Sequence, residues 1–280
     1  MKQRDGQFAG AGGHSLYFRY WEPEEQARAI ILLVHGAGEH CTRYQHLAEY
    51  FSSRGYAIAG FDHIGHGKSD GQYGFVERFD DHLESLGNFR QQLERDFPGL
   101  PVILLGHSMG GLISSLYLLQ HQHQFIGCAL SGPAIKTDLQ PPAIQILLIR
   151  LLSRLAPKLG VLQLDAAGVS RDQVVVDDYC ADPLVFHGKM SARMVAEMFA
   201  GMNRIQEQAA KISLPLLLLH GGGDVMTAPS GSQFLHDHVS SKEKTLKIYP
   251  GLYHEIFNEP EQQEVFADLL GWCEERLAAV

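Results

Sequence analysis

The sequence has no surplus of basic residues, since its 23 lysines and arginines are outnumbered by 32 aspartates and glutamates. A general nucleic-acid-binding protein needs a basic face to neutralise phosphates, so we expect no nucleic-acid partner. No apolar run reaches the roughly 20 residues that span a bilayer. The first 21 residues also lack the apolar core of a secretory signal. We therefore expect a cytoplasmic protein, with peripheral contact to a membrane left open.

Cysteine is also scarce, and the motifs of several cofactor sites are missing. The four cysteines stand far apart at positions 41, 128, 180 and 273, without a Cys-x-x-Cys pair. This spacing disfavours a zinc site and predicts free thiols. Neither G-x-G-x-x-G nor G-x-x-x-x-G-K-[ST] occurs, which disfavours a nucleotide site. We expect neither a metal nor an organic cofactor.

What the chain does contain is an alternation of short apolar runs and amphipathic segments. The apolar runs predict strands over 29–36, 56–62, 101–107, 125–132, 214–221 and 245–251. Between them, helical periodicity predicts helices over 42–55, with Thr42 as a possible N-cap, and over 81–97, 110–120 and 261–277. Strands that are apolar throughout are buried on both faces. The pattern predicts an α/β protein with a mostly parallel sheet between helices.

The stretch 133–212 breaks this rhythm, because it shows no clear strand. We interpret it as a helical lid inserted between two parts of one core, 1–132 and 213–280. Within it, 143–162 predicts a helix that is apolar nearly all round, apart from a basic stripe of Arg150, Arg154 and Lys158. Such a helix either packs on the core with the stripe in water or lies in a membrane interface. Leu148 and Leu152 on this helix are candidates for contact with a substrate or a membrane.

The segment GHSMGG, 106–111, places a serine where a predicted strand turns into a predicted helix. One interpretation is a helix cap, whose oxygen accepts from the first free N–H groups. The other is a nucleophile elbow, because Gly106-His107-Ser108-Met109-Gly110 fits G-x-S-x-G in its strand–turn–helix context. As a nucleophile, Ser108 needs a base, an orienting acid and donors for an oxyanion.

Candidates for these partners follow Ser108 in the order Ser, Asp, His that such a fold requires. Asp224 follows the strand 214–221, where it could also be a plain turn residue. His254 is the only histidine after the last predicted strand. The oxyanion donors would be the backbone N–H groups of Met109 and of Ala37, in the glycine-rich loop after the first long strand.

Five segments together carry a family resemblance: HGAGEHCTRY, FDHIGHGKSDG, GHSMGG, LHGGGDVMTAPSGS and YPGLYHEIFNE. In this order and spacing they resemble the monoacylglycerol lipases and related lysophospholipases of the α/β-hydrolase superfamily. The segment 177–194 is similar to the return segment of that family's lid, whereas 138–165 has a sequence of its own. Met226 stands where a branched aliphatic residue is more usual.

The resemblance implies an α/β-hydrolase fold with a lid and a serine hydrolase that cleaves monoacylglycerols to fatty acid and glycerol. It implies Ser108 as nucleophile, Asp224 and His254 as the rest of the triad, and the Ala37 and Met109 amides as the oxyanion hole. It also implies a lipid ester as substrate and no cofactor. His187, in the lid's return segment, is a candidate for the alcohol end of the pocket.

Three alternatives stay open at this point. A lysophospholipase differs only on the alcohol side of the pocket, and a general carboxylesterase would use the same residues. A non-catalytic binding protein of the same fold is disfavoured, because Ser108, Asp224 and His254 are all present. The sequence leaves acyl-chain length and oligomeric state open.

Overall fold

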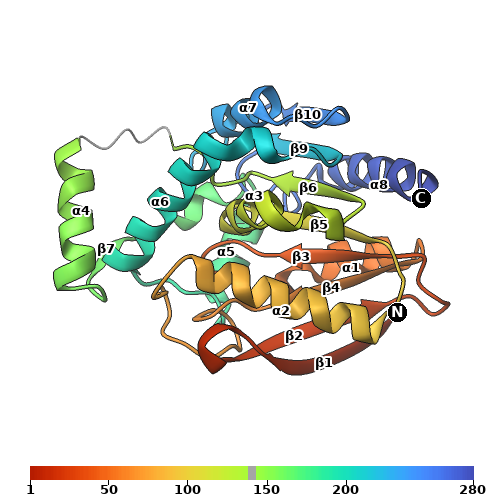
Figure 1. Ribbon diagram of the computed structural model, residues 1–280, viewed down its shortest axis with the longest axis horizontal. Coiled ribbons are helices and arrows are strands. Elements are labelled where there is room, and N and C mark those ends of the chain that lie inside the picture. The colour runs from red at the N-terminus through yellow and green to blue at the C-terminus, as the bar shows by residue number, and fades with distance from the viewer. Residues whose placement is uncertain (138–142) are drawn as a thin grey trace.

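The computed structural model describes residues 1–137 and 143–280. One eight-stranded sheet crosses the molecule in the order β1-β2-β4-β3-β5-β6-β9-β10 (Figure 1). From β4 to β10 in this order the strands pair in parallel, while β2 pairs antiparallel with both β1 and β4. The predicted, mostly parallel sheet is thereby confirmed. Its strands are β1 (Lys2–Ala9), β2 (Ser15–Glu22), β3 (Ala29–Val34), β4 (Tyr56–Phe61), β5 (Val102–His107), β6 (Gly127–Ser131), β9 (Leu216–Gly221) and β10 (Lys244–Tyr249).

Helices cover both faces of this sheet and form a separate apolar core on each. Along β3, Ile30 and Leu32 point into one core, while Ile31 and Leu33 point into the other. Successive side chains of a strand alternate between faces, so a strand between two helical layers is apolar throughout. The first core contains α2 (Asp80–Asp96), α3 (Met109–His121) and α7 (Pro229–His238), and the second contains α1 (Gln45–Ser52) and α8 (Gln262–Ala278).

The β1–β2 hairpin was not expected from the sequence. Strand β1 is an edge strand, and all but two of its eight side chains are exposed. Its charged residues Lys2, Arg4 and Asp5 are typical of an exposed edge strand, where they oppose pairing with another chain. Because of these charges, the segment lacks the apolar alternation that predicts a strand. The helix predicted over 42–55 is also shorter, since α1 begins at Gln45 after a 3-10 turn (Cys41–Tyr44). Thr42 does not cap it and instead lies 2.7 Å from His40 Nδ1.

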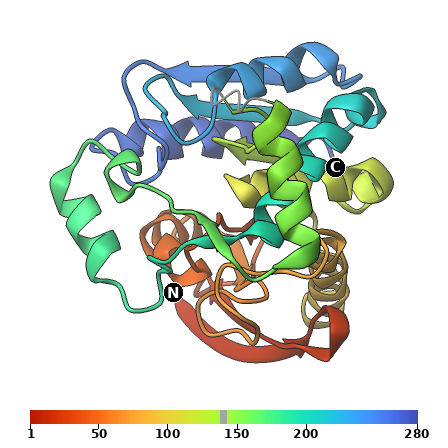
Figure 2. The same ribbon diagram turned by 90° about the vertical axis from the view of Figure 1, so that its left-hand side faces the viewer.

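Between β6 and β9, which are neighbours in the sheet, the chain leaves the core and returns. This excursion contains α4 (Ala143–Leu155), β7 (Gly160–Leu162), α5 (Gln173–Ala181), β8 (Met190–Ser191) and α6 (Ala192–Gln208). Figure 2 looks directly onto it, with α4 crossing in front of α6. The boundaries 133 and 212 stay a prediction, and residues 138–142 of the predicted lid lie outside the described residues.

Two expectations about this excursion are wrong. The helix predicted over 143–162 ends at Leu155, because Pro157 lacks a backbone donor and Gly160 opens a strand. The excursion also contains a short antiparallel pair, β7 with β8, which the sequence did not indicate. A strand of two or three residues is too short to show a period.

Candidate active site

Ser108 lies at the turn between β5 and α3 in a backbone conformation that side chains rarely adopt. Its φ of 53° is the one positive φ of a non-glycine residue within the described parts of the chain. The neighbouring glycines permit the turn, since a Cβ on Gly110 would lie 2.0 Å from the carbonyl oxygen of Val34. The Ser108 side chain caps no amide of α3, so the helix-cap interpretation is wrong. A strained residue held in place by its surroundings is typical of a functional site.

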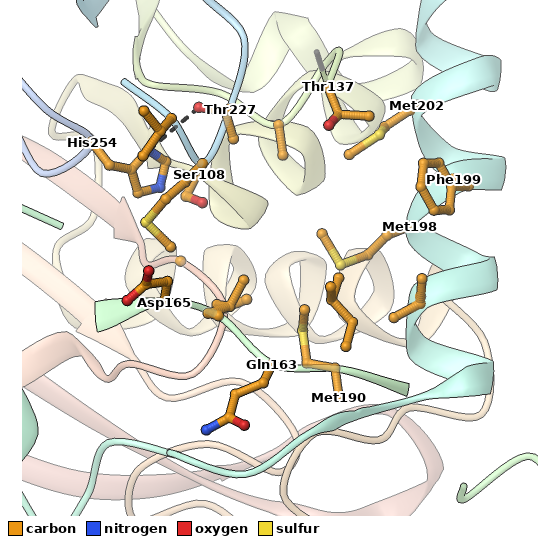
Figure 3. A pocket seen from close by; sticks show the side chains of 18 of the residues that line it. Ser108, Thr137, Gln163, Asp165, Met190, Met198, Phe199, Met202, Thr227 and His254 are labelled. Atoms are coloured by element: carbon orange, nitrogen blue, oxygen red, sulfur yellow. Dashed lines mark hydrogen bonds between the residues drawn. The ribbon is translucent and has the colours of Figure 1, made fainter. Parts of the chain in front are cut away.

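Asp224 and His254 meet on two loops at the carboxyl ends of β9 and β10. His254 Nδ1 lies 2.7 Å from Asp224 Oδ2, and both side chains are buried. Figure 3 shows His254 beside Ser108 at one end of a pocket, and both residues line that pocket. With Nδ1 donating to the carboxylate, His254 keeps Nε2 free to accept a proton.

The carboxylate of Asp224 is held by more groups than His254. The amides of Met226 and Thr227 donate to Oδ1 at 2.8 and 3.0 Å, and His220 Nε2 lies 3.1 Å from Oδ2. Burial alone would raise the pKa of Asp224, but the charge of His254 and hydrogen bonds from both histidines keep that pKa well below its usual range. Asp224 therefore stays ionised. The contact of His220 with Asp224 could not be predicted from the sequence, where His220 is only a polar residue at the end of an apolar run.

The same interaction acts on His254. Burial lowers the pKa of an imidazole, but the charge of Asp224 and the hydrogen bond to it outweigh burial and raise the pKa of His254. His107, whose ring centroid lies 4.7 Å from that of His254, behaves differently. Burial and then the His254 charge lower the pKa of His107 to about 3. Only one of these adjacent imidazoles is therefore basic.

Of the two predicted oxyanion donors, one lines this pocket and the other adjoins Ser108. Ala37 lines it directly, and Met109 follows Ser108 at the first turn of α3. In the part of the chain that the structure describes, neither amide donates to another protein group. The loop before Ala37 is fixed by Glu39, whose Oε1 accepts from the Gly36 amide at 2.6 Å. Two unpaired amides beside a reacting carbonyl group can stabilise a developing negative charge.

The pocket is a cavity of about 940 Å³ with chemically different ends. Near Ser108 and His254 its wall includes Asp165, which Figure 3 shows, and the polar residues Glu39 and Glu255. Away from Ser108, Figure 3 shows methionine and phenylalanine side chains of α6. This apolar wall contains Leu148, Ile149, Leu152, Met190, Val195, Met198, Phe199 and Met202. The predicted contact residues Leu148 and Leu152 thus lie on the cavity, and their role stays a prediction.

His187 lies elsewhere than expected. It lines a second cavity of about 560 Å³ together with Cys180 and Phe186. This cavity borders the first one, since Gln163 and Tyr179 contribute to both. A role of His187 at the alcohol end of the Ser108 pocket therefore stays a prediction without support from its position.

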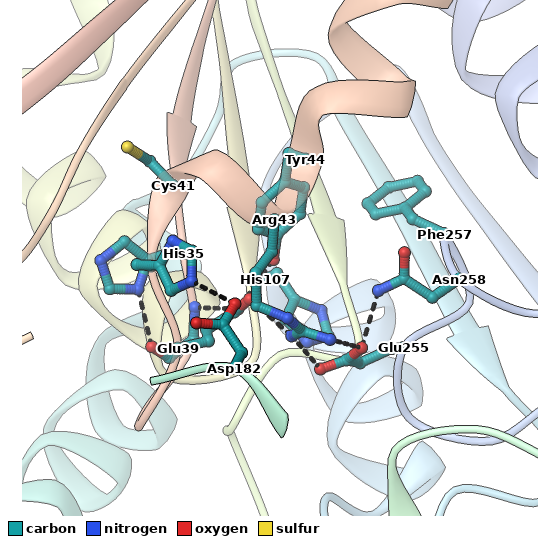
Figure 4. A network of polar contacts seen from close by, with 12 residues as sticks. His35, Glu39, Cys41, Arg43, Tyr44, His107, Asp182, Glu255, Phe257 and Asn258 are labelled. Atoms are coloured by element: carbon teal, nitrogen blue, oxygen red, sulfur yellow. Dashed lines mark hydrogen bonds and ion pairs between the residues drawn. The ribbon is translucent and has the colours of Figure 1, made fainter. Parts of the chain in front are cut away.

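Sequence reasoning missed a group of buried charges beside the site, shown in Figure 4. Arg43 contacts Glu39 at 3.1 Å and both carboxylate oxygens of Glu255 at 2.6 and 2.8 Å. A signal was available, because Glu39 and Arg43 belong to HGAGEHCTRY and Glu255 follows His254 directly. Charged residues within a motif next to an apolar strand end are candidates for a buried ion pair.

Two further expectations can be compared with the structure. All four cysteines are free thiols, as predicted, and Cys180 alone among them is exposed. Across residues 1–137 and 143–280, no helix is both long and apolar enough to cross a membrane.

Comparison with known proteins is consistent with this geometry. The profile of a family described as "Serine aminopeptidase, S33" matches residues 25–261. The monoacylglycerol lipase of Mycolicibacterium smegmatis is 38% identical over 95% of this chain and 95% of its own. The human monoglyceride lipase is 33% identical over 96% of this chain and 89% of its own. The crystal structure of the Paleococcus ferrophilus monoacylglycerol lipase superposes with a TM-score of 0.83 at 31% identity, covering 99% of this chain and all of that one.

Proposed function

The chain belongs to the monoacylglycerol lipase family of α/β-hydrolases, and on that premise we propose that it cleaves monoacylglycerols to fatty acid and glycerol. One observation carries the proposal. The buried Asp224–His254 pair stands beside Ser108 at the polar end of a 940 Å³ cavity, and the wall away from Ser108 is apolar. A pocket of this size lies near the upper end of the range typical of small-molecule sites.

The proposed reaction uses only groups of this chain and water. Ser108 Oγ attacks the ester carbonyl, while His254 Nε2 takes the hydroxyl proton. The carbonyl oxygen becomes an oxyanion that accepts from the Ala37 and Met109 amides. Protonated His254 then gives its proton to the glycerol oxygen as the ester C–O bond breaks. Water, deprotonated by the same imidazole, hydrolyses the acyl-enzyme and regenerates Ser108.

The two ends of the cavity fit the two parts of this substrate. The apolar wall of α4 and α6 suits a long acyl chain, because burying each methylene group stabilises binding by about 0.8 kcal/mol. Methionines supply much of this wall at positions 190, 198 and 202. Their unbranched side chains adapt to chains of different length. The polar wall at Ser108 suits the hydroxyl groups of glycerol.

Charge at the polar wall favours glycerol over a phosphodiester as the leaving group. Glu39, Asp165 and Glu255 line this end of the cavity, and the cation that faces two of them, Arg43, is already engaged by both. Lys136 also lines the cavity, but its Nζ lies over the Phe234 ring at 4.3 Å. An anionic phosphate would enter against like charge, which costs binding energy at short range. This argues against the alternative of a lysophospholipase.

A substrate panel tests the choice. We expect kcat/KM of the purified protein to rank a long-chain monoacylglycerol above the matching lysophosphatidylcholine, a diacylglycerol and a short nitrophenyl ester. Lysophosphatidylglycerol, with its net negative headgroup, should be the poorest of the single-chain lipids. A preference for lysophospholipids would retain the chemistry and contradict the proposed substrate. Cleavage of the short ester alone would contradict the assignment of the apolar wall to an acyl chain.

We also propose that α4 docks on a lipid surface, from which such substrates enter the cavity. Three leucines one turn apart on its outer side are largely exposed, namely Leu147 (62%), Leu151 (50%) and Leu155 (75%). Arg150 and Arg154 on the same helix are exposed as well. An exposed apolar face with adjacent basic residues is typical of helices that lie in a membrane interface.

A further inference from the structure

The buried charges Glu39, Arg43 and Glu255 connect two loops that are far apart in the sequence. Glu39 and Arg43 follow β3, whereas Glu255 stands in the loop after β10. Arg43 Nη1 and Nη2 donate to the two oxygens of Glu255 at 2.6 and 2.8 Å, and Nη1 also donates to Glu39 Oε2 at 3.1 Å. A guanidinium that donates to both oxygens of a carboxylate fixes orientation as well as distance.

Each end of this bridge is attached to a part of the proposed reaction centre. On one side, Glu39 accepts from the Gly36 amide at 2.6 Å, one residue before the Ala37 oxyanion donor. On the other, Glu255 follows His254 in the chain and also accepts from Asn258 Nδ2 at 2.7 Å. Figure 4 shows the bridge from Glu39 through Arg43 to Glu255. Through its two ends, the bridge links the loop of the proposed oxyanion donor with the loop of His254.

We propose that Glu255 is a positioning residue, which through Arg43 and Glu39 holds the oxyanion loop in register with His254. The inference rests on the proposed function, since it concerns the efficiency of the same site. An oxyanion donor must lie at hydrogen-bond distance from the position that the charge will occupy. A displacement of about 1 Å can cost a hundredfold in rate. A bridge with all three side chains largely buried is suited to prevent such a displacement.

The charge of Glu255 has a second, separable effect on His254. Burial would raise the pKa of Glu255, but Arg43 lowers it to about 2, so the carboxylate stays ionised. After Asp224, both Glu255 and Glu39 contribute to the raised pKa of His254. The titratable and charged groups facing His254 and Glu255 are Asp224, His107, Glu39, Arg43 and Tyr179. Removing the Glu255 charge should therefore make His254 less basic.

Two substitutions at position 255 separate the bridge from the charge. In Glu255→Gln the charge is lost, and one amide oxygen cannot replace both contacts to Arg43. We expect kcat on monoacylglycerol to fall about tenfold, while KM stays within about threefold of the wild-type value. In the pH profile of kcat/KM, the acid limb should move about half a pH unit lower. In Glu255→Asp the charge is kept, but the shorter side chain no longer reaches Arg43. In this variant kcat should fall, while the acid limb of the pH profile stays at its wild-type position.

Glu259→Gln is the matched control. Glu259 is a buried carboxylate of the same loop that accepts from the Tyr253 amide at 2.7 Å and binds Arg171 instead of Arg43. We expect it to lower the melting temperature while leaving the acid limb in place. Arg43→Lys keeps the charge and loses the two-pronged contact, so it should repeat the fall in kcat even if Glu255→Gln does not fold.

Two results would overturn the inference. The first is a kcat within twofold of wild type in folded Glu255→Gln or in Arg43→Lys. The second is an equal shift of the acid limb in Glu259→Gln. All variants are also assayed on a nitrophenyl ester. If wild type cleaves this ester and not monoacylglycerol, the proposed substrate fails while the role of Glu255 is still measured.

Discussion

At the scale of single residues, the charge of Asp224 determines what His254 can do. The carboxylate fixes the Nδ1–H tautomer at 2.7 Å and stabilises the protonated ring. In Asp224→Asn the charge is lost and the amide can hold the wrong tautomer. We expect kcat to fall by roughly 10⁴, measured on monoacylglycerol. Asp237→Asn, an exposed aspartate of α7, serves as control and should leave kcat unchanged. A loss of less than tenfold in Asp224→Asn would contradict the assigned role.

The raised pKa of His254 also predicts the pH dependence of the reaction. The base must be neutral to accept the Ser108 proton, so activity falls as pH drops through the pKa of His254. Because Asp224 raises that pKa above the usual 6.5, the acid limb of kcat/KM should lie above pH 6.5. A profile measured between pH 5 and 9 tests this. Full activity at pH 6 would show that a different group acts as the base.

Gly110 shows how closely the turn is packed. A Cβ there would meet backbone oxygens of Val34 and His35 at 2.0 and 2.4 Å, and backbone cannot give way cheaply. We expect Gly110→Ala to lower the free energy of unfolding by about 3 kcal/mol or more. Gly271→Ala in α8 is the matched control, since nothing lies within 4 Å of its Cβ position. It should stabilise by about 0.5 to 1 kcal/mol. Urea titration of both variants decides, and equal midpoints would contradict the packing argument.

At the scale of elements, α4 presents two apolar faces, for which we propose different roles. Leu147 and Leu151 are exposed, whereas Ile149 and Leu152 are half-buried on the cavity. The double substitution Leu147→Ser/Leu151→Ser should weaken co-sedimentation with anionic vesicles about tenfold while leaving kcat on a dispersed short ester unchanged. Ile149→Ser/Leu152→Ser should leave co-sedimentation with vesicles unchanged and raise KM for the long-chain ester. Equal vesicle binding by wild type and both variants would exclude α4 as the docking face.

At the scale of elements, some strands, helices and contacts could be predicted from the sequence and others could not. The parallel strands β3, β4, β5, β6 and β9 follow from continuous apolar runs, and Ser108, Asp224 and His254 stand in the loops after parallel strands. Strand β1 could not be predicted because this exposed edge strand carries charged residues in place of an apolar alternation. The contact of Arg43 with Glu255 spans 212 positions, and no local pattern indicates a partner at that distance. The helix predicted over 143–162 extends beyond the observed end at Leu155, because apolar residues continue in the sequence after Pro157.

At the scale of the whole molecule, buried histidines make stability depend on pH. His35, His63, His66 and His82 lie in ring contact with one another beside the loop after β3, and within residues 1–137 and 143–280 neither ring nitrogen of His82 has a hydrogen-bond partner. Burial, then the neighbouring His66, lowers the pKa of His82 to about 3. The unfolded chain binds a proton near pH 6.5 and the folded protein does not. The free energy of unfolding therefore falls as pH drops from about 6.5 toward 3.

Replacing His82 tests this dependence. His82→Leu removes the titrating group and two unpaired polar atoms while keeping an apolar volume in the core. We expect it to raise the free energy of unfolding at pH 7 by about 1 kcal/mol and to lessen its loss between pH 6.5 and 4. Equilibrium unfolding at several pH values measures both. A variant with the same pH slope as wild type would show that His82 is not responsible.

The measurement that tests the central claim most directly is the release of fatty acid and glycerol from a long-chain monoacylglycerol by wild type and by Ser108→Ala. Both proteins should show the same melting temperature, so that a difference in rate reports chemistry. We expect wild type to release the two products in equimolar amounts. The rate of Ser108→Ala should be lower by a factor of about a thousand or more. Comparable release by folded Ser108→Ala would contradict the assignment of Ser108 as the nucleophile.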